Sequence, residues 1–378
     1  MGARPTEHAG LGPLQLLIYC TLGLLFAVTA AAWFASRGPW IGLEVSSGPS
    51  GAKVLAVVPE GPLAGRLTPG DTLRALEGEG VSISFAAYEP VLNPHALSSF
   101  GALNGYLQRQ GTIAEALAGQ TATLVLVDGR RISFSPYPNR PIGSLPRDFW
   151  LLHLFGSLSA IIGLSVWVFK RSQRPAQLLA LSGAGFFFAT WMHSLWRARE
   201  LALPEWLFDM LLRFNHVGLH LLLVTLLILL ASYPQRIGGN RPTALLIAGG
   251  VAVQVNENLQ LWDWPLHSFY VPLLLYYPIG IALALLQWRR ARANPLDRAV
   301  LRWVFLSVMI TMGVGMVVYF LPLVVSTQPL VDVTTMVGLA VTMYLGFALG
   351  VLRYRLFELE HWWFLAWAWF LGGLAVLL

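Results

Sequence analysis

Residues 217–233 read VGLHLLLVTLLILLASY, an apolar run without a charged residue. Further apolar runs fill the block from Trp150 to Tyr354, and short polar turns separate them. About 20 such residues cross a bilayer core as a helix. Of the 378 residues 56% are hydrophobic and 12% are charged, whereas a soluble domain has about 25% charged residues. The sequence therefore predicts a polytopic α-helical membrane bundle over residues 149–355.

The spacing of the apolar runs predicts one membrane span before the bundle and seven within it. The predicted spans are Leu14–Phe34, Phe149–Phe169, Ala176–Trp196, Val217–Tyr233, Thr243–Leu261, Phe269–Trp288, Trp303–Val325 and Val333–Leu352. Arginine and lysine follow the second, fourth, sixth and eighth spans, whereas the loops at Trp262–His267 and Ser326–Asp332 have neither. Positive loops mark the cytoplasmic side. We therefore expect a multi-pass protein of the bacterial cytoplasmic membrane with a cytoplasmic N-terminus.

Two further features concern the ends of the chain. Residues 1–36 hold the first span, where Ala30-Ala31-Ala32 resembles a signal-peptidase site; the length of the run favours an uncleaved anchor. After Arg355, residues 356–378 begin another apolar run, which we expect to be the first part of a truncated membrane helix. Cys20 is the only cysteine, so the chain forms no intrachain disulfide and no thiolate metal cluster.

Residues 37–148 have the composition of a soluble α+β domain, which the predicted topology places outside the cytoplasm. The residue types predict strands and a helix, the helix interrupted near Gly111. Asp128-Gly129 is a strong hairpin signal between two further strands. In chain order the predicted elements are the strands Ile41–Val45, Ala52–Val58 and Thr72–Leu76, the helix Leu97–Leu117, and the strands Thr121–Val127 and Arg130–Ser135.

The order of these elements, with the segments Val57–Ala64 and Leu67–Leu73, resembles a PDZ domain. In that family a Gly-Φ-Gly-Φ loop, where Φ is apolar, holds a peptide carboxylate on its backbone N–H groups. The resemblance makes Gly42, Leu43, Glu44 and Val45 the candidate peptide groove. Glu44 replaces the second glycine and adds negative charge, and a long insert spans Gly78–Phe100. Two interpretations of this domain therefore remain: a PDZ-like fold with a purely structural role, and a domain that binds peptides.

One predicted external loop carries positive charge against the general pattern. Arg197, Arg199 and Arg213 surround the amphipathic stretch Leu203–Leu212. Either that stretch lies flat on the outer surface, or its charges serve a site. At the same predicted level, the fifth span ends in polar residues, which are costly in a membrane unless they face protein or a water-filled cavity. The candidate ligand pocket is His193, Arg197, Arg199, Arg213, His216, His220, Asn256, Glu257 and Asn258.

Two interpretations of this pocket stay open. In one, an arginine pairs with Glu257 or holds an anionic ligand; in the other, the polar groups form interhelical hydrogen bonds without a ligand. His216 and His220 are four residues apart and share a helix face, a spacing that suits a metal ion. Hydrogen bonding between helices is the favoured role for both, so we assign no metal and no cofactor.

The sequence carries no motif of an active site, neither a Walker loop nor HExxH nor Gly-x-Ser-x-Gly. The net charge of +6 is spread over short loops, which argues against a nucleic-acid partner. The inner loop Arg289–Arg302 and the exit Leu352–Glu360, together with the overall order, resemble the sensor region of bacterial histidine kinases of the competence pheromone-receptor type.

This resemblance implies a membrane input module of a two-component system. It receives a peptide or small-molecule signal and passes it to a phosphoacceptor helix and an ATPase domain, which would follow Leu378 and form a homodimer. Two alternatives stay open. One is a non-catalytic membrane protein that holds peptides in its PDZ-like domain. The other is a small-solute transporter, which the polar fifth span suggests but which lacks paired interrupted spans.

Overall fold

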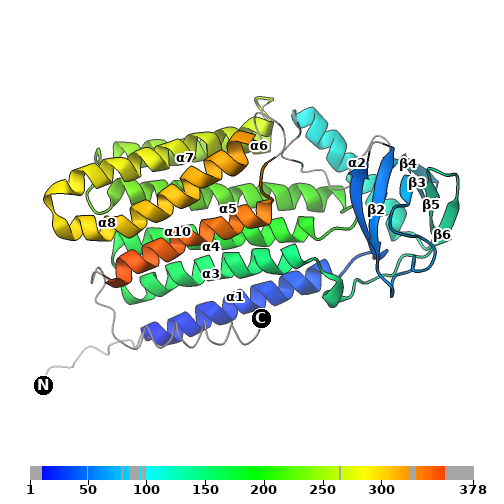
Figure 1. The fold of residues 1–378 in the computed structure, drawn as a ribbon, viewed down its shortest axis with the longest axis horizontal. Helices are drawn as coiled ribbons and strands as arrows, with labels where there is room; N and C mark the ends of the chain where they lie inside the picture. The colour runs from blue at the N-terminus through cyan, green and yellow to red at the C-terminus, as the bar shows by residue number, and fades with distance from the viewer. Residues whose placement is uncertain are drawn as a thin grey trace, which may run out of the picture.

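The computed structural model describes residues 11–48, 50–78, 80–85, 94, 97, 99–263, 265–322 and 329–353. Figure 1 shows a bundle of long helices with a small sheet domain at one end. The sequence predictions for residues 1–10, for most of the exit after Leu352 and for the apolar run to Leu378 lie outside the described residues.

Long helices make up the bundle, and they cover the predicted spans within the described residues. In chain order they are α1 (Pro13–Ala35), α3 (Arg147–Phe169), α4 (Arg174–Arg197), α5 (Glu205–Ser232), α6 (Arg241–Leu259), α7 (Pro265–Arg290), α8 (Pro295–Val308) and α10 (Val333–Arg353). Two π-helical segments, Met309–Val314 and Met316–Phe320, continue α8. The described chain is thus mainly a helical bundle, as predicted.

Five of the described helices are long and apolar enough to cross a membrane, which identifies the chain as a membrane protein. They are Pro13–Ala35, Arg147–Phe169, Arg174–Arg197, Glu205–Ser232 and Asp297–Phe320. Among the described residues, the predicted spans on α6, α7 and α10 are not in this group, and α10 provides a shorter apolar helix, Val333–Leu349. Helix α6 ends in a polar segment at Asn256, Glu257 and Asn258, which lowers its apolar character.

The sheet domain is antiparallel throughout, with strand order β1-β2-β3-β5-β6 and β4 paired to β3. Helix α2 (Phe100–Ala118) packs through Ile113 and Leu117 into the same apolar core as the strands. The strands are β1 (Leu43–Gly48), β2 (Gly51–Val57), β3 (Thr72–Gly78), β4 (Val81–Ser84), β5 (Ala122–Leu126) and β6 (Arg131–Phe134). The predicted hairpin at Asp128-Gly129 joins β5 to β6. The described chain thus combines a helical bundle with a small antiparallel sheet, and both share one apolar core.

One local prediction is wrong. Helix α2 is continuous through Gly111, because that glycine lets the helix approach α5: a Cβ added there would lie 3.0 Å from the Cβ of Glu205. The stretch Leu203–Leu212, for which two interpretations were open, does not form an element of its own. From Glu205 onward it forms the first turns of the 28-residue helix α5, whose buried face continues without a break to Ala231. In addition, β4 lies inside the predicted insert.

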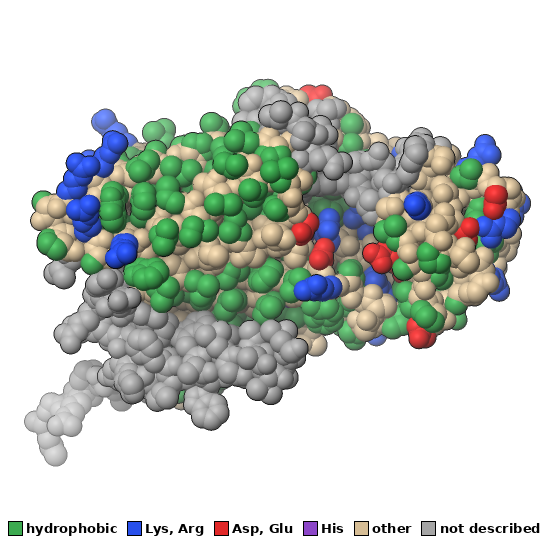
Figure 2. Space-filling model, viewed as in Figure 1, with side chains coloured by type: hydrophobic (Ala, Val, Ile, Leu, Met, Phe, Trp, Pro, Cys, Tyr) green, Lys and Arg blue, Asp and Glu red, His purple; other side chains and the backbone are tan. Residues whose placement is uncertain are grey.

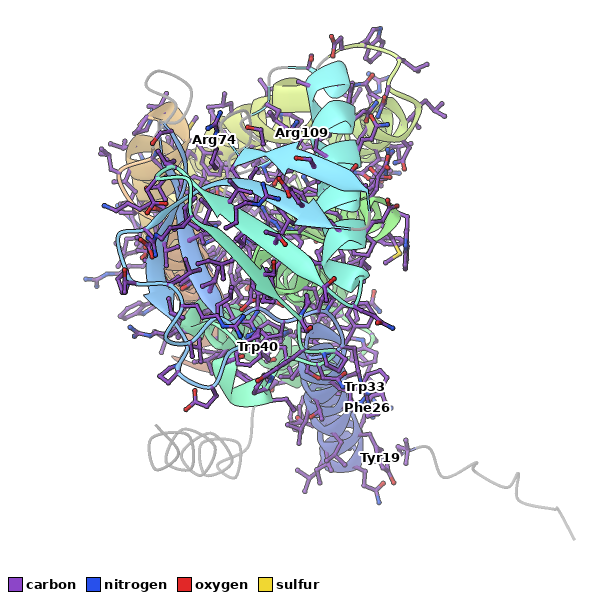
Figure 3. The ribbon with its side chains drawn as sticks, turned by 90° about the vertical axis from the view of Figure 1, so that its right-hand side faces the viewer. Tyr19, Phe26, Trp33, Trp40, Arg74 and Arg109 are labelled. Atoms are coloured by element: carbon purple, nitrogen blue, oxygen red, sulfur yellow. The ribbon has the colours of Figure 1, made fainter. Side chains whose placement is uncertain are left out.

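The chain enters and leaves the sheet domain at one place. Trp40 and Tyr137 form an isolated antiparallel bridge, with N–H to carbonyl distances of 2.8 and 2.9 Å. The Arg140 backbone N–H donates to the Ser36 carbonyl just beyond the end of α1, at 2.9 Å. Trp40 therefore lies where the chain passes from α1 to the sheet (Figure 3). These bonds hold the sheet domain close to the ends of α1 and α3.

Helices α3, α4 and α5 pack closely through glycines. A Cβ added to Gly156 on α3 would lie 3.2 Å from the Cα of Phe187 on α4, and one added to Gly218 on α5 would lie 2.6 Å from the backbone nitrogen of Ala189 on α4. Small residues let helix backbones approach one another in membrane bundles. Helix α4 is consequently fixed between its two neighbours.

Candidate functional site

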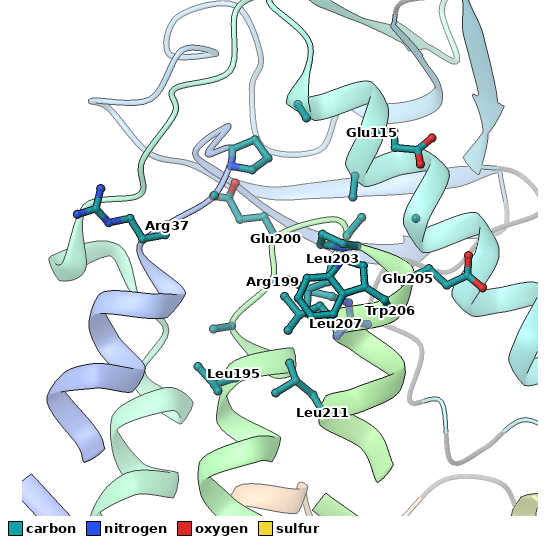
Figure 4. A pocket seen from close by; sticks show the side chains of 18 of the residues that line it. Arg37, Glu115, Leu195, Arg199, Glu200, Leu203, Glu205, Trp206, Leu207 and Leu211 are labelled. Atoms are coloured by element: carbon teal, nitrogen blue, oxygen red, sulfur yellow. The ribbon is translucent and has the colours of Figure 1, made fainter. Parts of the chain in front are cut away.

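The connection between α4 and α5, residues 198–204, reaches into the sheet domain. Its Glu200 carboxylate accepts two backbone hydrogen bonds, from the N–H of Ile41 at 2.8 Å and from the N–H of Gly42 at 3.1 Å. Both donors directly precede β1; Gly42 is the first residue of the predicted peptide groove, and Ile41 is its neighbour outside that groove. Figure 4 shows Glu200 extending from this connection toward the segment before β1. An internal carboxylate therefore binds the N–H of Gly42, the first of the candidate groove residues.

The backbone of this loop explains why it binds a carboxylate. Gly42 has φ of +72°, a conformation that glycine adopts readily. A Cβ on Gly42 would lie 3.0 Å from the Cα of Gly61, and the Gly42 carbonyl accepts from the Val58 N–H at 2.8 Å. Successive backbone N–H groups facing the same way form an anion-binding concavity. Glu44 does not obstruct it, because its side chain is exposed.

Charge and burial act on Glu200 in opposite directions. Burial raises the pKa of the Glu200 carboxyl above its ordinary value of 4.5, whereas the hydrogen bond from Ile41 and the nearby Arg140 guanidinium oppose the rise. Arg140 donates to the Ser144 carbonyl at 2.6 Å and to the Ala198 carbonyl. Its guanidinium thus holds the start of the α4–α5 connection against the chain that leads into α3.

This raised pKa predicts a pH dependence. Between the ordinary and the raised pKa the folded protein binds more protons at Glu200 than the unfolded chain does, so stability falls as the pH rises. Wild type should therefore gain stability relative to Glu200→Gln as the pH falls from neutral toward 4.5. Denaturation of both proteins across that range measures the difference. The assignment would be contradicted if the free energy of unfolding of wild type, minus that of Glu200→Gln, stayed constant or decreased as the pH falls.

A cavity of about 810 Å³ lies beside this contact, between α2 and the α4–α5 connection. Figure 4 shows its lining, with Glu115 on α2 and Leu203 and Trp206 on the opposite side. Arg37, Arg140 and Glu200 contribute charge to its lining, so it combines apolar walls with polar groups. This size and this mixture suit a small ligand or a peptide side chain.

Arg197 and Arg199 each contact another element of the structure. Arg199 donates to the Tyr106 hydroxyl of α2 at 2.9 Å, and its guanidinium lies 4.6 Å from the ring centre of Phe208. Arg197 pairs with Asp148 at 3.2 Å. Arg199 therefore joins the bundle to helix α2 of the sheet domain, whereas Arg197 joins α4 to the first turn of α3.

A second group of predicted pocket residues meets between α5 and α6. Nδ1 of His216 bonds to the Glu257 carboxylate, and both side chains are buried. Arg213 pairs with Asp209 at 2.8 Å and donates to the Glu257 and Asn258 carbonyls at 3.1 and 3.4 Å. The Glu257 carboxylate thus has His216 and Gln254 as partners, and the bonds from Arg213 to the α6 carbonyls are interhelical.

The remaining predicted residues have other contacts. His220 Nδ1 lies 3.4 Å from the Tyr276 hydroxyl of α7. Asn256 turns back to accept from the Trp262 backbone N–H at 2.8 Å. His193 lies in the interior of the bundle against the Trp196 ring. Among the described residues no group of three or more histidine, cysteine, aspartate or glutamate side chains is placed to hold a metal ion.

We expect Glu257→Ala to destabilise the protein by about 1–2 kcal/mol, because it leaves the buried His216 nitrogen without its acceptor. Glu257→Gln retains an acceptor oxygen and is the matched control, with a smaller loss. Denaturation of the purified proteins in detergent measures both. Equal stability of the alanine variant and wild type would show that the His216–Glu257 contact contributes nothing.

Sequence reasoning did not assign Glu200 or Arg140 to a site. Glu200 and Ile41 are 159 positions apart, and no local pattern connects them. Glu200 does closely follow Arg197 and Arg199 in the sequence. The positive charge of these two arginines in a predicted external loop was the signal that pointed to this region. Comparison of the chain with protein-family models, with curated proteins and with solved structures finds no match.

Proposed function

We propose that this chain is a membrane sensor, the input module of a two-component sensor histidine kinase. In this proposal residues 37–148 form an extracytoplasmic PDZ-like domain that reads an external signal. The observation that carries the proposal is the Glu200 carboxylate on the Ile41 and Gly42 N–H groups. It connects two bundle helices to the loop that the PDZ resemblance makes a ligand-binding site.

The distribution of charge supports the proposed orientation. Figure 2 shows lysine and arginine side chains gathered at the end of the bundle remote from the sheet domain. The α5–α6 and α7–α8 connections lie together there, since Gln235 contacts Asp297 at 3.5 Å. Positive charge marks the cytoplasmic side of a membrane protein. The sheet domain, at the opposite end, would accordingly lie outside the cytoplasm.

The proposed mechanism is competition for one site. A ligand with a free carboxylate, such as a peptide C-terminus, would displace Glu200 from the Ile41 and Gly42 N–H groups. Because Glu200 follows α4 and precedes α5, its release would change the packing of both helices. Ligands shift proteins among a few discrete packings in proportion to their differential affinity. The shift would reach the cytoplasmic side through α4 and α5.

A chimera tests the proposal. Residues 1–378 are joined to the catalytic core of a sensor histidine kinase, and autophosphorylation is measured in membranes. We expect Glu200→Ala to change the steady-state autophosphorylation at least twofold, whereas Glu115→Ala, a change to an exposed carboxylate on the wall of the same cavity, leaves it unaltered. Unchanged phosphorylation in a folded Glu200→Ala chimera would contradict the sensor proposal. It would favour the peptide-holding alternative instead.

A further inference from the structure

The cavity of about 810 Å³ beside Glu200 lies at the ends of three membrane helices. Its lining includes Ala35 at the end of α1, Leu195 in the last turn of α4 and Leu207 in the first turn of α5. Helices α1 and α4 have 23 and 24 residues, which makes each about 35 Å long, whereas the hydrocarbon core of a bilayer is about 30 Å thick. The cavity therefore lies where the hydrocarbon core meets the lipid headgroups.

The polarity of the lining changes from one end of the cavity to the other. Glu200 lies at one end, and the buried side chains of Leu195, Leu207 and Leu211 lie toward the other. Figure 4 shows this order, with Glu200 above, Leu207 below it, and Leu195 and Leu211 at the bottom. A molecule with one charged group and a hydrocarbon chain matches this lining.

The cavity borders on a surface that faces lipid. Phe34 of α1 and Trp206 of α5 both line the cavity, and they are 42% and 67% exposed. Only 11% of the apolar window of α1 is buried inside the structure, less than in the other candidate spans of the described chain. Tryptophan collects at membrane interfaces, where one part of its ring system is apolar and another is wet. A hydrocarbon chain can thus enter between α1 and α5 from the bilayer.

The polar end of the cavity already binds a carboxylate. The Glu200 side chain accepts from the N–H groups of Ile41 and Gly42 at 2.8 and 3.1 Å, and the Arg140 guanidinium lies close enough to attract its charge. Hydrogen bonds to an ionised acceptor are about twice as strong as those to a neutral one. The same pair of N–H groups therefore favours a carboxylate over a neutral head group in any molecule that replaces Glu200.

Three further carboxylates line the cavity. In Figure 4 the Glu115 and Glu205 side chains extend away from Glu200, and both are exposed. Water weakens the field of exposed charges. Asp209 pairs with Arg213 at 2.8 Å. These groups consequently repel a carboxylate at the Glu200 position only weakly.

We propose that the ligand of this site is a long-chain carboxylic acid that enters from the bilayer. Its carboxylate replaces Glu200 on the Ile41 and Gly42 N–H groups, and its hydrocarbon chain lies against Leu195 and Leu211. This inference rests on the proposed competition for the Glu200 site, and it specifies the chemical class of the competing ligand.

The test compares two photoreactive probes on the purified chain in lipid nanodiscs. One is dodecanoic acid with a diazirine at the end of its chain, and the other is the corresponding dodecanol. Mass spectrometry measures labelling of residues 195–211, and labelling around the exposed Leu245 of α6 measures uptake of each probe by the lipid. After this normalisation, the acid should label residues 195–211 about tenfold more than the alcohol, because its hydrogen bonds are charge-assisted.

Two variants change this labelling in opposite directions. Glu200→Ala removes the internal competitor and should increase labelling by the acid about threefold or more, because the binding-competent state is then always available. Ala202→Phe, which places a large side chain at a half-buried lining position, should reduce it to the level seen with the alcohol.

Amide hydrogen exchange provides a second measurement, which does not depend on Ala202→Phe folding. In Glu200→Ala, dodecanoate supplies the missing carboxylate, so exchange at Ile41 and Gly42 should slow about threefold or more. Dodecanol should leave it unchanged. Equal labelling of residues 195–211 by acid and alcohol would overturn the proposal, as would exchange in Glu200→Ala that dodecanoate does not slow.

The two proposals fail separately. A peptide with a free C-terminus that slows exchange at Ile41 and Gly42, where dodecanoate does not, would assign the site to peptides and overturn this inference alone. Unchanged autophosphorylation of the Glu200→Ala chimera would contradict the sensor proposal even if dodecanoate binds as expected.

Discussion

Replacing Glu200 with alanine is expected to free the loop before β1, with a local cost of about 2–3 kcal/mol. The variant leaves the N–H groups of Ile41 and Gly42 without their acceptor and removes the negative charge near Arg140. Hydrogen bonds to charged groups contribute more than neutral ones. Amide hydrogen exchange at Ile41 and Gly42 should accelerate roughly 30- to 150-fold, since local opening governs exchange.

Glu115→Ala is the matched control for this measurement. Glu115 lines the same cavity from α2, but its side chain is exposed. Its removal should leave exchange at Ile41 and Gly42 unchanged. Exchange in Glu200→Ala that equals that of wild type would mean that the carboxylate does not hold the loop, and the proposed competition between Glu200 and a ligand would lose its basis.

Gly218→Val is expected to destabilise the bundle by about 3 kcal/mol or more. A Cβ on Gly218 would lie 2.6 Å from the Ala189 backbone nitrogen and 2.9 Å from the Ala189 Cα. Because both are backbone atoms of α4, the clash is relieved only if the helices separate. Overpacking of a close-packed interior typically costs about 1–3 kcal/mol and occasionally more. Unfolding in sodium dodecyl sulfate, followed by tryptophan fluorescence, measures the loss.

Gly249→Val on α6 is the matched control, because a Cβ at Gly249 has no neighbouring atom within 4 Å. The same substitution should change stability there by less than about 0.5 kcal/mol, as at other surface positions. If Gly218→Val and Gly249→Val have equal effects, the close approach of α4 and α5 does not contribute to the stability of the bundle.

The coarse architecture was predictable because it depends on local composition. Apolar runs such as 217–233 are too long for a core helix of a small domain, and the Asp128-Gly129 turn fixes a hairpin by its own backbone preference. Gly111 was interpreted wrongly for the same reason. Glycine weakens a helix locally, but here the close packing of α2 on Glu205 outweighs that preference.

The contacts of the candidate site were only partly predictable. The polar end of α6 was expected to meet residues of α4 and α5, and it does meet His216 and Arg213. The partner of the Glu257 carboxylate was not predictable, since an arginine and a histidine were both within reach on sequence grounds. The position of Glu200 depends on how the α4–α5 connection packs against a segment 159 positions earlier in the chain, which no local pattern encodes.

Docking of α2 against the start of α5 is tested most directly by a disulfide between Gly111→Cys and Glu205→Cys, in a Cys20→Ser background that removes the native thiol. The two Cβ positions are 3.0 Å apart, and disulfides need about 3.5–4.5 Å, a shift of less than about 1 Å. We predict rapid and nearly complete disulfide formation, with a lower yield when Glu200→Ala is added. Failure of the pair to oxidise in the folded protein would contradict the docked arrangement.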